Sequence, residues 1–81
     1  MKPKIDDLMS MQDILKTAIK REVEAREFYL KAKERARTPF EEELFDRLAD
    51  QEADHRKALE KQLNEIQAQI ETDRALSFDI Y

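Results

Sequence analysis

The sequence predicts an all-α protein: an antiparallel two-helix hairpin that dimerises into a four-helix bundle. Three observations support this fold class. The 81-residue chain has no glycine and two prolines, so it lacks the residues that make the tight turns of a small β or α/β protein. Apolar residues recur at steps of three and four in two long segments, which is the period of a helix face. A short turn signal separates the two segments.

The first helix is predicted from about residue 11 to residue 37. Ser10 followed by Asp13 is typical of a helix start with an acidic first turn. One stripe runs along this segment and contains a glutamate among apolar and small residues, namely Ile14, Leu15, Ala18, Ile19, Glu22, Ala25, Tyr29, Ala32 and Ala36.

The second helix is predicted from about residue 39 to residue 71. Thr38 stands at the cap position, Pro39 at the first helical position, and Glu41 is placed to complete a capping box. The stripe of this helix includes a glutamate and a histidine, in the series Phe45, Leu48, Glu52, His55, Leu59, Leu63, Ile66 and Ile70. Residues 72–81 show no clear period and are expected to form a C-terminal tail.

The whole chain, residues 1–81, is interpreted as one half-bundle. The short connection forces the helices to run antiparallel, and each stripe is wide enough to need more than one neighbour. Two helices cannot enclose a core, so we expect a homodimer or a ring of dimers.

Composition excludes several other classes. There is no cysteine, and the net charge of −4 comes from 19 acidic and 15 basic residues mixed along the chain, which argues against nucleic acid as a partner. No apolar run is long enough for a membrane span or a signal peptide. We therefore expect a cytoplasmic protein with neither nucleic acid nor membrane as its partner.

Glu22, Glu52 and His55 occupy positions in the stripes that should be apolar. Glu22 and Glu52 each lie about 15 residues from the turn, so both are roughly 22 Å from the hairpin tip. Glu52 and His55 form a Glu-x-x-His pair whose side chains project together. One hairpin supplies two carboxylates and one imidazole, and a two-fold partner doubles them to a set that suits two iron or manganese ions.

The segments around these ligands, residues 22–29 and 44–55, resemble the rubrerythrin branch of the ferritin-like superfamily. The resemblance covers about residues 11–63, and a chain with one helix pair is most similar to encapsulated ferritins, which build a ferroxidase centre between two subunits. It implies that Glu22, Glu52 and His55 bind iron and that Tyr29 lies beside the metals as a catalytic residue. The implied activity is oxidation of Fe²⁺ with O₂ or peroxide, linked to iron storage.

The sequence also departs from these families. Residues 75–81 lack the glycine of the docking peptide that delivers encapsulated ferritins to an encapsulin shell, and the chain has none of the cysteines of a rubredoxin segment. Two alternatives remain open. The Glu/His layer can fix register in a non-catalytic helical scaffold without any metal, or the chain can be a fragment of a longer rubrerythrin-like protein.

Overall fold

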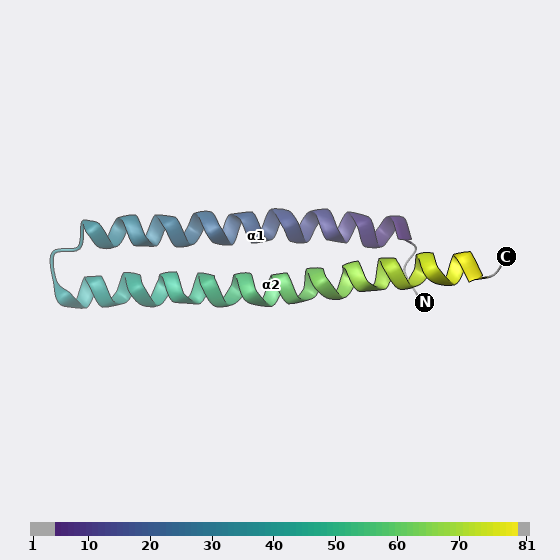
Figure 1. The fold of residues 1–81 in the computed structure, drawn as a ribbon. Helices are drawn as coiled ribbons and strands as arrows, with labels where there is room; N and C mark the ends of the chain where they lie inside the picture. The colour runs from purple at the N-terminus through teal and green to yellow at the C-terminus, as the bar shows by residue number, and fades with distance from the viewer. Residues whose placement is uncertain (1–4, 80–81) are drawn as a thin grey trace.

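The computed structural model is a hairpin of two long helices. It describes the backbone of residues 5–79 and the side chains of residues 10–76. Helix α1 spans Ile5–Glu34 and helix α2 spans Pro39–Asp79. The helices lie side by side and run antiparallel, with the turn at one end and both termini at the other (Figure 1). The predicted all-α hairpin is confirmed, and the described residues form no strand.

Both helices differ from their predicted bounds. α1 begins at Ile5 instead of residue 11, and α2 continues to Asp79, so residues 72–79 are helix and not an unpatterned tail. No glycine or proline stands between Ile5 and Ser10 or between Thr72 and Asp79, and therefore nothing in the chain interrupts either helix. The last two residues of the predicted tail, 80 and 81, lie outside the described residues.

The first helix is also shorter at the turn, where it ends at Glu34 and not at residue 37. The backbone N–H groups of Arg35 and Ala36 donate to the carbonyls of Ala32 and Lys33 at 3.0 Å, three residues back. This tighter last turn satisfies the free carbonyls at the helix end. Residues 35–38 form the turn, and α2 begins at Pro39.

The predicted cap of α2 forms, with one change of partner. The Glu41 N–H donates to Thr38 Oγ1 at 3.1 Å, as expected of a threonine cap. Glu41 Oε2 accepts a hydrogen bond from the N–H of Arg37 at 3.0 Å, one residue before the cap. The side chains of Thr38 and Glu41 therefore satisfy amides on both sides of the turn.

We expect Thr38→Ala to lower the free energy of unfolding by about 1 kcal/mol, because the Glu41 amide loses its acceptor. The matched control is Thr72→Ala, since the Thr72 hydroxyl donates to the Ala68 carbonyl inside a helix and caps nothing. Urea denaturation at one fixed protein concentration measures both variants. Equal stabilities for the two variants would contradict the capping role.

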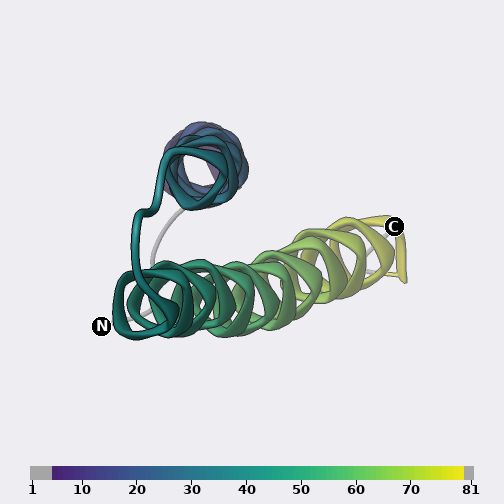
Figure 2. The ribbon, with the colours of Figure 1, turned by 90° about the vertical axis from the view of Figure 1, so that its left-hand side faces the viewer.

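The two helices share little buried surface. Among the residues with described side chains, only Ala49 and Ile70 are buried. The molecule is elongated, with extents of 66 × 19 × 14 Å, and in Figure 2 α2 runs obliquely across the direction of α1. Near the tip, Lys33 Nζ pairs with Asp46 Oδ1 at 3.0 Å and joins the helices; this hydrogen bond and the Asp46 charge raise the pKa of Lys33.

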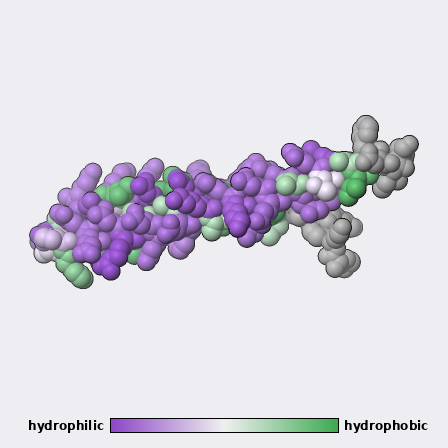
Figure 3. Space-filling model, turned by 60° about the horizontal axis from the view of Figure 1, so that its bottom comes forward, coloured by the Kyte–Doolittle hydropathy of each residue, from purple (hydrophilic) through white to green (hydrophobic). Residues whose placement is uncertain are grey.

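Large apolar side chains stay exposed on the hairpin. Ile14, predicted to lie in the buried stripe, is 60% exposed, because α2 covers only one side of that stripe. Other exposed apolar side chains are Met11, Phe28, Phe40, Leu44 and Leu76. The side of the molecule seen in Figure 3 is mostly hydrophilic, with hydrophobic residues in scattered patches. Over the described residues, neither helix contains an apolar stretch that could cross a membrane.

Candidate metal centre

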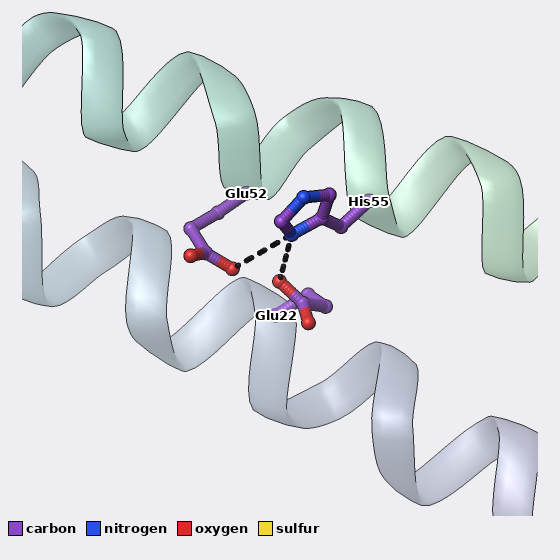
Figure 4. A group of neighbouring side chains, drawn as sticks. All are labelled: Glu22, Glu52 and His55. Atoms are coloured by element: carbon purple, nitrogen blue, oxygen red, sulfur yellow. Dashed lines mark ion pairs between the residues drawn. The ribbon is translucent and has the colours of Figure 1, made fainter.

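Glu22 from α1 meets Glu52 and His55 from α2 midway along the hairpin. His55 Nδ1 lies 3.6 Å from Glu22 Oε2 and 3.6 Å from Glu52 Oε2. One donor atom from each of the three residues falls within 4.8 Å of the other two. Figure 4 shows the two carboxylates and the imidazole directed toward one another between the helices. The structure therefore brings together the three residues that the sequence predicts as ligands.

The burial of this cluster is uneven. The carboxylates of Glu22 and Glu52 are largely covered, with side chains 23% and 18% exposed, whereas His55 is 61% exposed. Glu22 Oε2 is itself buried and has no hydrogen-bond partner among the described residues. A buried carboxylate oxygen without a hydrogen-bond donor is costly, and His55 Nδ1, at 3.6 Å, lies beyond hydrogen-bond distance of it. A divalent metal would offset this cost and fits the mixed oxygen and nitrogen donors.

The basic residues nearby do not offset this cost. Within the described part of the chain, the ion pairs of Glu22 and Glu52 are those with His55, which is charged only when protonated. Arg56, one turn after Glu52, pairs instead with Glu60, with Nε 3.4 Å from Oε1. Over the described side chains, no lysine or arginine pairs with either carboxylate of the cluster.

Tyr29, the fourth predicted site residue, lies half-buried on α1 and two turns nearer the tip than Glu22. Its ring meets the ring of Phe28 edge to face, with centroids 5.5 Å apart. Tyr29 is not a member of the group of potential metal ligands. Its place beside the metals stays a prediction.

The sequence reasoning missed one feature of the site. A surface groove begins at Glu22 and follows α1 toward the open end of the hairpin, lined by Asp13, Ile14, Thr17, Ala18, Arg21 and Glu22. The sequence contains one indication of this groove: Ile14, Ala18 and Arg21 are spaced by four and three residues, which places them on one face of the helix. Their exposure could not be read from that spacing.

With this geometry established, the comparison with known families is decisive. The family model described as Rubrerythrin matches residues 13–78. The chain belongs to the rubrerythrin family. No curated protein and no solved structure gives a significant match. The matched segment covers most of both helices of this rubrerythrin-family chain and all three residues of the Glu/Glu/His cluster.

Membership gives the cluster a chemical context. The rubrerythrin family has a ferritin-like, iron-binding fold, and its members typically bind iron. Metal sites in this class of bundle combine glutamates from facing helices with Glu-x-x-His pairs. Glu52 and His55 form such a pair on α2, and Glu22 faces them from α1. The cluster is therefore a candidate iron site that contains half of the usual ligands.

Proposed function

We propose that this chain forms a homodimer whose subunit interface holds a di-iron ferroxidase centre. Glu22, Glu52 and His55 of each copy supply the ligands. The observation that carries the proposal is the Glu/Glu/His cluster itself, with donor atoms within 4.8 Å of one another and an orphaned carboxylate oxygen.

The ligand count supports a shared centre. One hairpin offers two carboxylates and one imidazole, which is too few for a pair of iron ions. His55 is mostly exposed, so a second copy can approach the cluster from that side. A two-fold axis through the cluster gives four glutamates and two histidines. Four carboxylates so close together repel one another, and two divalent cations remove that repulsion.

The chemistry assigned to this centre is oxidation of Fe²⁺ as a substrate. The carboxylates of Glu22 and Glu52 and the imidazole of His55 would hold the ions. Each ferrous ion gives up one electron. Two electrons and two protons reduce O₂ to hydrogen peroxide, or two electrons and two protons reduce hydrogen peroxide to two waters. Carboxylate-rich ligation favours this reaction because it stabilises the more highly charged ferric product.

Native mass spectrometry after anaerobic addition of Fe²⁺ tests the proposal directly, since it counts chains and metals together. We expect dimers, or multiples of dimers, with two irons for every two chains. Binding should appear only in assemblies that contain both copies of the ligand set. Addition of Mn²⁺ in the same way shows whether the centre binds manganese as well as iron.

Two results would contradict the shared centre. Dimers that stay metal-free at high Fe²⁺ would support a scaffold with a polar Glu/His layer. Monomers that persist with Fe²⁺ would show that the ligand set is not completed by a second copy of this chain.

A further inference from the structure

Arg56 stands between two glutamates on α2. Glu52 lies four residues before it and Glu60 four residues after it, so both carboxylates project from the same side of the helix as the guanidinium. The positions three residues before and three residues after Arg56 are Ala53 and Leu59. Within one turn of this helix, Arg56 can therefore pair either with a candidate metal ligand or with Glu60.

The structure pairs Arg56 with Glu60. Arg56 Nε lies 3.4 Å from Glu60 Oε1, while Glu52 Oε2 lies 3.6 Å from the imidazole of His55. This choice runs against the ordinary preference of a helix, in which a glutamate pairs better with a cation four residues after it than with one four residues before it. The guanidinium is thus turned away from the partner that helix electrostatics favour.

The contact with Glu60 holds Arg56 only loosely. Arg56 Nε is buried, and despite the short distance to Glu60 its N–H donates no hydrogen bond among the described residues. The Glu60 side chain is 49% exposed, whereas that of Glu52 is 18% exposed. Ion pairs strengthen where water is excluded. The covered carboxylate of Glu52 is therefore a strong competitor for the same guanidinium.

We propose that Glu60 is a positioning residue that holds the Arg56 guanidinium away from Glu52 and so leaves the Glu52 carboxylate free to bind a metal ion. The inference rests on the proposed function in one respect, which is that the Glu/Glu/His cluster binds metal. Without Glu60, the carboxylate that remains within one turn of Arg56 on α2 is Glu52. A metal ion must then displace the arginine before it can bind, so its affinity falls.

Glu60→Ala tests this role, because it removes the partner and places a good helix former at an exposed position. Anaerobic calorimetric titration with Fe²⁺ at physiological ionic strength measures the dissociation constant. We expect this constant to rise by about 10-fold, the lower end of the range for loss of a residue that acts through a metal ligand. Circular dichroism should show unchanged helical content.

Glu43→Ala is the matched control. Glu43 is exposed on the same helix and lies nine residues before Glu52, whereas Glu60 lies eight residues after it. Both substitutions remove one negative charge at about 12 to 14 Å from Glu52 along the helix. Charges this far apart at the surface are largely screened. We expect the control to bind Fe²⁺ with a dissociation constant within about two-fold of wild type.

The double variant Arg56→Met/Glu60→Ala shows whether the effect passes through the arginine. Methionine keeps an unbranched stem that can pack as the arginine stem does, but it carries no charge. We expect the double variant to recover the wild-type dissociation constant, and Arg56→Met alone to bind Fe²⁺ at least as tightly as wild type. If the ion pair only stabilised α2, Arg56→Met would weaken binding as much as Glu60→Ala, and the double variant would recover nothing. That result would overturn the proposal.

The same titrations separate this inference from the proposed function. Tight binding of Fe²⁺ by wild type, with equal dissociation constants for Glu60→Ala and Glu43→Ala, would leave the metal centre in place and refute the role of Glu60. A wild-type protein that binds no Fe²⁺ would refute both the metal centre and this inference.

Discussion

Glu52→Ala and His55→Ala are each expected to reduce ferrous iron oxidation to the rate of Fe²⁺ in protein-free buffer. Both residues coordinate the same ion in the proposed centre. Because the dimer is symmetric, each substitution removes two ligands per dimer. Loss of an outer-sphere partner of a metal ligand already costs about 10- to 100-fold in affinity or activity, so loss of a direct ligand should exceed that. Absorbance of ferric product after aerobic mixing with Fe²⁺ follows the rate.

Asp54→Ala is the matched control for these variants. Asp54 lies between Glu52 and His55 in the sequence, but its side chain is exposed and it is not in the ligand group. We expect it to keep the wild-type rate. Circular dichroism should show nearly unchanged helical content in all three variants, since alanine is a good helix former. Wild-type rates in Glu52→Ala or His55→Ala chains would rule out the proposed centre.

Removal of metal is expected to destabilise the wild-type dimer strongly. Glu22 Oε2 is buried without a hydrogen-bond partner among the described residues, and without a cation the dimer must hold four carboxylates in one layer. Metal at a concentration of 100 times its dissociation constant stabilises a folded protein by about 2.7 kcal/mol per site. For two sites in a dimer of this size, we expect chelation to lower Tm by on the order of 10 °C or more.

The triple variant Glu22→Leu/Glu52→Leu/His55→Leu separates a metal centre from a simple polar layer. Its dimer should be as stable as the metal-loaded wild type, and chelator should leave its Tm unchanged, because well-packed apolar residues can replace buried ionic groups without loss. Thermal unfolding at one protein concentration, with anaerobic Fe²⁺ or with chelator, measures both proteins. A wild-type Tm that does not respond to metal would favour the scaffold alternative.

Local sequence signals predicted much of the hairpin. The turn was identified because Thr38 and Pro39 act within a few residues: a hydroxyl accepts from the amide three positions on, and proline fixes the first helical residue. The predicted start of the first helix and the predicted end of the second were wrong. Ser10 does not block a helix that begins earlier, and residues 72–79 contain no residue that ends a helix. Helix propensity without glycine or proline let both helices run further than the apolar pattern indicated.

The cluster of candidate ligands was predictable for a similar reason. The three-residue interval from Glu52 to His55 places both side chains on one face of a helix, and the equal distances from the turn make Glu22 level with them. The structure adds what those intervals do not contain: the 3.6 Å separations at His55 Nδ1 and the orphaned Glu22 Oε2. These depend on side-chain conformations between two helices.

The sequence by itself determined the helical hairpin, its cap and the choice of Glu22, Glu52 and His55, because each follows from short-range periodicity along one helix. Only the tertiary structure decided which side of each stripe stays open. Ile14 has the spacing of a buried residue and is exposed, and Phe28 projects from the same face. The physical reason is that periodicity defines a face of a helix but not its neighbour. The oblique packing of α2 covers one side of α1 and leaves the groove beside Glu22 free.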